Sequence, residues 1–164
     1  NVLIVHAAGN DGRNNDSISI FPKGYYSNGT RAKNWICVGA SQAKDDENLI
    51  ASFSNYGKNS VDILAPGQDI NSCILNNQFE AGSGTSLAAP VVSGIAAVIK
   101  SYYPKISAFQ LKEIIIKSAY KPKVNQVLVP GQKNKKTKLT EITASGGIAN
   151  LYRALRLVES KNQF

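Results

Sequence analysis

The chain has 164 residues, of which 43% are apolar and 18% are charged, and its formal net charge is +8. These proportions predict one globular domain and exclude intrinsic disorder and a multidomain chain. The longest nearly uncharged apolar run, Leu87 to Ile99, is too short for the roughly 20 residues of a membrane-spanning helix, so no membrane span is predicted.

Short apolar runs separated by polar turns make up the first half of the chain. The run NVLIVHAA at residues 1–8 is continuous and rich in β-branched residues, which predicts a central strand covered on both faces of a parallel sheet. It stops at the turn Gly9-Asn10-Asp11-Gly12. Further strands are predicted at residues 35–40, 51–54, 61–64 and, at a sheet edge, 78–81.

Helices are predicted in the second half. Residues 86–103 lack a polar stripe until Lys100, which predicts a helix that is buried on all sides, begins near Ser86 with Pro90 in its first turn, and ends before Pro104. Ser107-Ala108-Phe109-Gln110 predicts a capping box for a second helix. The apolar residues that follow this pattern are Leu111, Ile114, Ile115 and Ala119 in the second helix, and Leu151, Leu155 and Val158 in a third helix at about residues 149–160. Short strands followed by helices predict an α/β domain with a mostly parallel sheet flanked by helices.

The excess positive charge is confined to one segment. Seven lysines lie between Lys117 and Lys138, with no acidic residue and with Tyr120 as the only aromatic one. Nucleic-acid-binding segments usually add arginines and stacking aromatics, so no nucleic-acid partner is predicted. We expect residues 121–138 to form a basic, solvated loop, and binding of an acidic partner is the alternative.

Several residues limit the class of protein further. The chain begins with Asn1 and contains no methionine, so we expect its natural N-terminus to be missing. Cys37 and Cys73 are too few for a disulfide framework and lack the spacing of a zinc site, so we expect two small buried thiols. No paired partner is identified for Asp62 or Asp69.

The segment Gly82 to Pro90 (GSGTSLAAP) could carry chemistry. Glycines around Ser86 at the start of a helix place its hydroxyl where backbone N–H groups converge. Alternatively, Ser86 is only a helix cap and the glycines permit close packing. The segment Ala7-Ala8-Gly9-Asn10 ends a strand at the sheet edge where α/β proteins place their sites, and it offers a carboxamide donor.

Together these blocks resemble the subtilisin-like serine proteases. The resemblance rests on AAGN at residues 7–10, VGA at 38–40, ASFSNYG at 51–57, VDILAPG at 61–67, GTSLAAPVVSGIAAVI at 84–99 and GGIANLYRAL at 146–155. The blocks occur in the family's order and span nearly the whole chain, residues 1–164. The resemblance implies a subtilisin-like fold that is truncated at its N-terminal side.

The resemblance also implies roles for individual residues. Ser86 matches the nucleophile, and the side-chain amide of Asn10 pairs with the Ser86 N–H as the oxyanion hole. Ala7, Ala8 and Gly9 would form the floor of the specificity pocket, and Gly84 and Thr85 are assigned to substrate binding with them. Leu87 stands where the family usually has Met.

The family's catalytic Asp and His lie upstream of the AAGN strand, and both motifs are absent here. The only histidine, His6, lies inside the first strand, where we expect a structural role. We therefore expect this chain alone to be inactive and to depend on an upstream segment, or to self-associate through residues 2–8. The family implies a protein or peptide substrate, an extracellular or cell-envelope location, and sometimes calcium, for which no ligand spacing is readable.

Alternatives from other classes remain. Gly84-Thr85-Ser86-Leu87-Ala88 approaches the G-x-S-x-G motif of α/β-hydrolase esterases, but that fold needs a later His, and none follows Ser86. A nucleotide-binding loop would need a lysine that is missing here. A subtilase-fold domain that has lost its catalytic triad, and acts as a non-catalytic binding or scaffold domain, is the main alternative.

Overall fold

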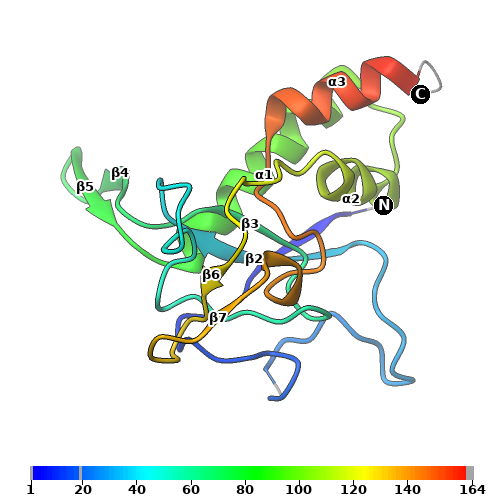
Figure 1. Ribbon diagram of the computed structural model, residues 1–164. Coiled ribbons are helices and arrows are strands. Elements are labelled where there is room, and N and C mark those ends of the chain that lie inside the picture. The colour runs from blue at the N-terminus through cyan, green and yellow to red at the C-terminus, as the bar shows by residue number, and fades with distance from the viewer. Residues whose placement is uncertain (1, 19, 162–164) are drawn as a thin grey trace.

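A computed structural model describes residues 2–18 and 20–161 (Figure 1). A three-stranded parallel sheet is formed by β1 (Ile4–Ala7), β2 (Trp35–Ser41) and β3 (Ile63–Pro66) in the order β1-β2-β3. Two antiparallel hairpins pair β4 (Ile70–Ile74) with β5 (Gln78–Gly82) and β6 (Val127–Leu128) with β7 (Lys136–Thr137). The helices are α1 (Thr85–Tyr102), α2 (Ala108–Lys117), α3 (Leu151–Lys161) and a short 3₁₀ turn (Leu139–Glu141). The predicted α/β class is confirmed.

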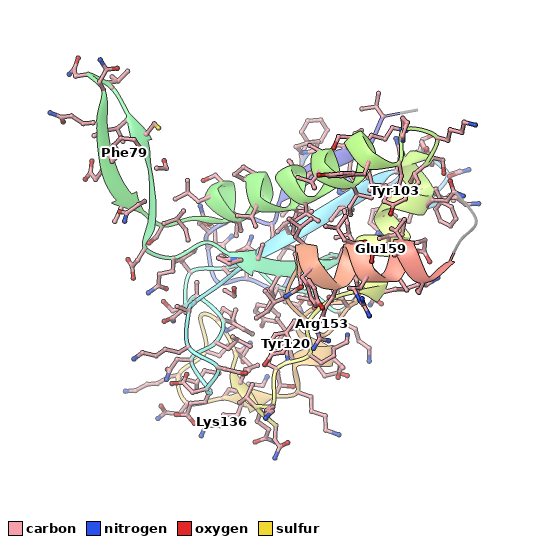
Figure 2. All side chains as sticks on the ribbon, turned by 90° about the horizontal axis from the view of Figure 1, so that it is seen from above. Phe79, Tyr103, Tyr120, Lys136, Arg153 and Glu159 are labelled. Atoms are coloured by element: carbon pink, nitrogen blue, oxygen red, sulfur yellow. The ribbon has the colours of Figure 1, made fainter. Side chains whose placement is uncertain are left out.

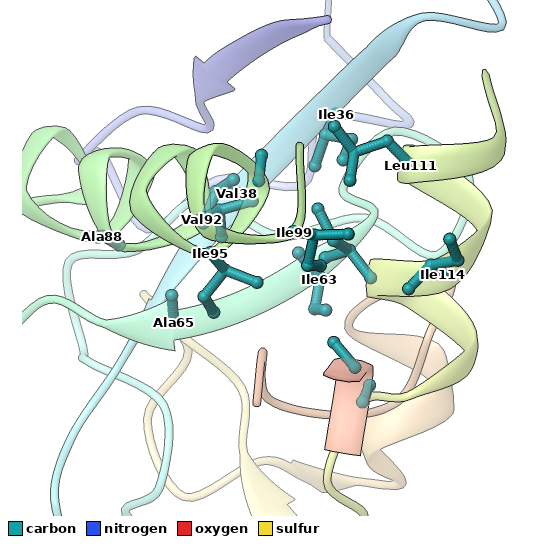
Figure 3. Close-up of a cluster of buried hydrophobic side chains, with 14 of the residues drawn as sticks. Ile36, Val38, Ile63, Ala65, Ala88, Val92, Ile95, Ile99, Leu111 and Ile114 are labelled. Atoms are coloured by element: carbon teal, nitrogen blue, oxygen red, sulfur yellow. The ribbon is translucent and has the colours of Figure 1, made fainter. Parts of the chain in front are cut away.

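The three helices cover one face of the sheet, and loops and the β6–β7 hairpin cover the other. On β2, alternate residues such as Ile36 and Val38 point into a core shared with α1, α2 and α3 (Figure 3). Cys37, between them, points to the opposite face and packs with Trp35. This two-residue alternation explains why all seven residues of β2 are buried, as a strand covered on both faces must be.

The first strand was predicted to be central, and that prediction is wrong for this chain. Within the described residues β1 pairs with β2 alone, so it forms an edge of the sheet. Ile4 is 43% exposed. An apolar run shows that a strand can be buried, but it does not show whether another strand lies beside it.

The prediction that the long helix is buried on all sides is also wrong. Helix α1 begins one residue before Ser86 and ends before Pro104, as expected. However, its buried residues form a single stripe, and Pro90, Ser93, Gly94 and Ala97 are exposed. Pro90 is the sixth helical residue and therefore lies beyond the first turn. The apolar exposed face has no covering layer among the described residues.

By length and composition alone, α1 could span a membrane, because its 18 residues have a mean hydropathy of 1.2. Its buried stripe packs on β1, β2 and β3. We therefore interpret α1 as the core helix of an α/β domain.

Other local predictions had mixed outcomes. The capping box at Ser107 is present, and α2 and α3 form where the periodicity predicted them. Residues 51–54 form a turn rather than a strand, closed by the Ser54 N–H donating to the Ala51 carbonyl over 2.9 Å. Strand β5 exists, but its partner β4 was not predicted.

The basic segment 121–138 contains the β6–β7 hairpin. Its lysines are exposed, as predicted, whereas Val127 and Val129 are buried against Leu64 and Ile142. Of the two cysteines, Cys37 is buried and Cys73 is exposed, so the expectation of two buried thiols fails for Cys73.

Candidate active site

The N-terminus of α1 lies at the carboxyl end of the parallel sheet. The Gly84 N–H donates to the carbonyl of Gly67, which directly follows β3, over 2.8 Å. A Cβ on Gly67 would lie 2.8 Å from the Ala40 Cβ and 2.9 Å from the Gly84 oxygen. Only glycine permits this close approach, which brings the start of α1 against the ends of β2 and β3.

Thr85 ties the helix to the end of β1. Its backbone N–H and its hydroxyl both donate to Asn10 Oδ1, each over 2.9 Å, and its Oγ1 accepts the Gly9 N–H at 3.1 Å. Thr85 is 1% exposed. Since a backbone N–H can only donate, Oδ1 must face the helix. The Asn10 Nδ2 is therefore a donor that Thr85 does not use.

The side chains of Ser86 and Asn10 both lie beside Gly84. The position that a Cβ of Gly84 would occupy lies 3.0 Å from Ser86 Oγ, 3.5 Å from Asn10 Nδ2 and 3.8 Å from the Ser86 nitrogen. Ser86 and Asn10 are both exposed. Among the described residues, neither the Ser86 N–H nor Asn10 Nδ2 has a hydrogen-bond partner. A hydroxyl and two unused donors thus surround a solvent-accessible space at a helix N-terminus.

The loop that carries Asn10 is held by a buried asparagine that the sequence analysis assigned no role. Asn55, 1% exposed, accepts the N–H groups of Asp11 and Arg13 at 2.9 and 3.0 Å and donates its own N–H to the Gly9 carbonyl. Gly9 has φ +105°, which favours glycine. The backbone of residues 9–13 is therefore held in place by the buried Asn55.

The neighbouring Ser54 connects this support to the sheet. Its Oγ accepts the Ala40 N–H at 2.9 Å and donates to the Asn55 carbonyl at 2.9 Å. The block ASFSNYG therefore supports the candidate site without belonging to it. The adjacent Ala8 is 2% exposed, its N–H donates to the Val38 carbonyl and its carbonyl accepts from Asn15 Nδ2, so it presents almost no surface to a ligand.

The described residues do not supply a base to Ser86. His6 lies on the sheet face opposite α1, with its ring 4.9 Å from that of Trp35 and its Nδ1 3.9 Å from Cys37 Sγ. Burial lowers the pKa of His6. No hydrogen bond joins Ser86 to a histidine or a carboxylate within residues 2–18 and 20–161. The expected structural role of His6 fits this placement.

Comparison with known proteins places the chain in a family. Residues 1–150 match the model of the subtilase family of peptidases. The chain belongs to the subtilase family. This membership accounts for the joint presence of the AAGN and GTS segments around one space.

The most similar relatives include several proteases. A thermostable alkaline protease of Halalkalibacterium halodurans is 37% identical over 118 residues, which are 72% of this chain and 29% of that protein. The cell wall-associated protease of Bacillus subtilis is 37% identical over 119 residues, 73% of this chain and 12% of that protein. The chain therefore spans less than a third of either relative.

Solved structures agree with this assignment. The subtilase cytotoxin, described in work on the assembly of that toxin, superposes with a TM-score of 0.75 at 30% identity, covering 98% of this chain and 50% of that chain. The A-subunit of the AB5 toxin from E. coli gives a TM-score of 0.72 at 29% identity, covering 94% and 50%. The subtilisin-like fold is thus shown over nearly the whole chain, which matches half of each solved chain.

Asp62 is a buried carboxylate of this subtilase that forms ion pairs outside the candidate site. Asp62, 1% exposed, pairs with Arg31 at 2.8 Å and with Lys112 at 3.2 Å and accepts the Cys37 N–H at 2.7 Å. The sequence did not identify these partners of Asp62, because both are remote in sequence. Burial, followed by the charge of Asp62, raises the pKa of Cys37 to about 12, so this thiol is a poor nucleophile.

One cavity among the described residues lies away from Ser86 and Asn10. A cavity of about 660 Å³ lies on the His6 face of the sheet, against Trp35 and Cys37, and Ser86 and Asn10 do not line it. Within the described ranges no three His, Cys, Asp or Glu side chains are grouped to hold a metal ion.

Proposed function

We propose that this chain is the part of a serine endopeptidase that carries the nucleophile and the oxyanion hole. The observation that supports this most directly is the convergence of Ser86 Oγ and Asn10 Nδ2 on the space beside Gly84. The protease names of its relatives support the reaction class. The substrate would be a protein or peptide.

In the proposed mechanism, Ser86 Oγ attacks the scissile carbonyl and forms a tetrahedral intermediate. The negative oxygen of that intermediate accepts hydrogen bonds from Asn10 Nδ2 and the Ser86 N–H. Both donors are preorganised, because Thr85 holds Asn10 and the helix holds the Ser86 backbone. Preorganised donors need no reorientation as charge develops, which is why such sites stabilise transition states strongly. Ala7 and Gly9, which are partly exposed, would form the floor of the substrate pocket.

The proton of Ser86 would pass to a histidine, oriented by an aspartate, in an upstream segment. A serine hydroxyl without such a base stays protonated at neutral pH, so we propose that this chain alone is inactive. The free edge of β1 offers backbone N–H and C=O groups to a strand of that segment or, in its absence, to a second copy of the chain. An extracellular or cell-envelope location is consistent with the cell wall-associated relative.

The test uses the protein with the sequence that precedes Asn1 included. We expect hydrolysis of a fluorogenic peptide that Ser86→Ala abolishes. Asn10→Ala should lower kcat by about 10²–10³-fold, a magnitude measured within the subtilase family itself. Ser93→Ala, an exposed serine two turns further along α1, serves as the control and should leave kcat unchanged.

Two outcomes would contradict the proposal. Hydrolysis by residues 1–164 alone that disappears in Ser86→Ala would mean that a base within this chain has been missed. A folded longer protein that binds peptides but shows no Ser86-dependent turnover would favour the non-catalytic alternative.

A further inference from the structure

The β4–β5 hairpin projects from the body of the protein. Its two strands pair with each other, and among the described residues neither pairs with a further strand. Figures 1 and 2 show the hairpin standing away from the sheet and helices, with Phe79 far from the core. Isolated two-stranded hairpins are marginally stable in water, so a hairpin of this kind normally packs against another surface.

One face of the hairpin carries the exposed aromatic side chain of Phe79. Cys73 lies directly opposite Phe79, and Asn71 opposite Ala81, so these side chains share a face. Ser72 and Glu80 pair on the other face, which also carries Ile70 and Ile74 and is therefore mixed. At the tip, Leu75 is 85% exposed, and Phe79 is 75% exposed. We call the side chains of Cys73, Phe79 and Ala81, which share their face with Asn71, the hairpin apolar face.

The base of the hairpin is connected to Ser86. The Asp69 N–H donates to Ser83 Oγ over 3.0 Å, and the Gly84 N–H donates to the Gly67 carbonyl over 2.8 Å. Leu87 Cδ1 lies 3.1 Å from the position of a Cβ on Gly82. The base of the hairpin is therefore adjacent to Ser86, so a segment that docks on the hairpin lies near this serine.

Two other surfaces are also left uncovered by the part of the chain that the structure describes. One is the exposed face of α1, with Pro90, Gly94 and Ala97, and the other is the free edge of β1. Helix α1 starts next to the hairpin base and runs along β1 and β2. The solved subtilase chains share the fold of 98% of this chain and are about twice as long. A segment that covers the hairpin, α1 and β1 together must pass over the start of α1, where Ser86 lies.

We propose that the hairpin apolar face is a docking surface for the upstream segment that carries the catalytic base, and that docking there brings this base to Ser86. This proposal rests on the proposed function. A second copy of the chain is a poorer occupant, because each aromatic side chain buries at most about 250 Å². Two faces with one aromatic each therefore fall short of the roughly 1,200 Å² that a stable interface needs.

Cys73 makes the proposal testable without any substitution. Its exposed thiol lies on the hairpin apolar face, whereas Cys37 is buried and its pKa is raised to about 12. Iodoacetamide should therefore modify Cys73 and spare Cys37. The rate is followed by mass spectrometry of the peptide that contains Cys73, in residues 1–164 alone and in the protein with its upstream sequence.

We expect the upstream sequence to slow modification of Cys73 at least 10-fold. Equal rates in the two proteins would overturn the proposal. Protection that instead grows with the concentration of residues 1–164 alone would identify a second copy as the occupant and would also overturn it.

A matched pair of substitutions tests the role of Phe79 in the longer protein. Burying a phenylalanine contributes enough free energy that Phe79→Ser should raise the Cys73 modification rate about 10- to 100-fold and lower kcat. Tyr152→Ser removes an aromatic of similar exposure, 72%, from α3 and should change neither. Equal effects of the two substitutions would contradict docking at the hairpin.

The modification rate does not depend on catalysis, so it is also measured in Ser86→Ala. Protection of Cys73 together with no Ser86-dependent hydrolysis would refute the proposed function and leave the docking surface in place. Ser86-dependent hydrolysis with an unprotected Cys73 would refute the docking surface and leave the proposed function in place.

Discussion

Replacing Gly9 by alanine should destabilise the protein through two effects that the structure separates. The first is backbone strain, because Gly9 has φ +105° and such a conformation costs a residue with a Cβ about 1–3 kcal/mol. The second is a collision, since the new Cβ would lie 2.4 Å from Asn55 Nδ2. Asn55 is buried and cannot move without releasing the N–H groups of Asp11 and Arg13, each bond contributing about 0.5–1.5 kcal/mol.

Together these effects predict a loss of about 2–6 kcal/mol from a total stability of about 5–15 kcal/mol. For a chain of this size, the melting temperature should fall by about 5–20 °C. Circular dichroism during heating and guanidinium unfolding measure both quantities.

Gly29→Ala is the matched control for the Gly9 experiment. Gly29 also has a left-handed φ, +80°, but a Cβ there would meet nothing within 4 Å. It therefore reports the strain without the collision. If Gly9→Ala cost no more than Gly29→Ala, the support of residues 9–13 by Asn55 would be wrong.

Two further predictions concern buried polar groups. Asp62→Asn leaves two cationic partners without a counter-charge and should cost about 3–5 kcal/mol in guanidinium unfolding, whereas Asp46→Asn, in an exposed loop, should change little; similar losses would contradict the assigned network. Burial lowers the pKa of His6 from 6.5, so just below pH 6.5 the unfolded chain binds more protons than the folded chain and stability rises with pH. Unfolding between pH 5.5 and 7.5 should show this loss of stability toward acid, and His6→Asn should reduce it; an unchanged pH dependence would show that His6 is not its source.

Much of the fold could be predicted because its signals are local. The capping box at Ser107 and the apolar stripe of α2 lie within a few residues of each other, and the structure forms both. The centrality of β1 and the full burial of α1 were wrong for a common reason. Apolar residues favour burial, but burial also requires another part of the structure to cover them. The apolar sequences of β1 and α1 do not show whether such a covering layer is present.

The two central residues of the candidate site could be found from sequence, but their supports could not. Asn10 and Ser86 lie in sequence blocks that follow the order of the subtilisin-like proteases, and this order identified both residues. Thr85 was assigned only to substrate binding, but in the structure it donates two hydrogen bonds to Asn10 Oδ1. Asn55 lies in the block ASFSNYG, and the sequence analysis gave it no role. The partners of Asp62 are 31 and 50 positions away along the chain, at Arg31 and Lys112, and no spacing rule connects them.

Around Ser86, the donors of the proposed oxyanion hole are held in place within this chain, whereas the proposed proton acceptor belongs to the upstream segment. The donor side is rigid within this chain, since Asn10 is fixed by the buried Thr85, and its loop is fixed by the buried Asn55. The proton-accepting side is open, because no described histidine or carboxylate bonds to Ser86. Electrostatic stabilisation without a base leaves serine proteases only a small part of their rate enhancement. If the proposed function is correct, docking of the upstream segment therefore adds proton transfer to an oxyanion hole that is already formed, and the gain should appear in kcat more than in KM.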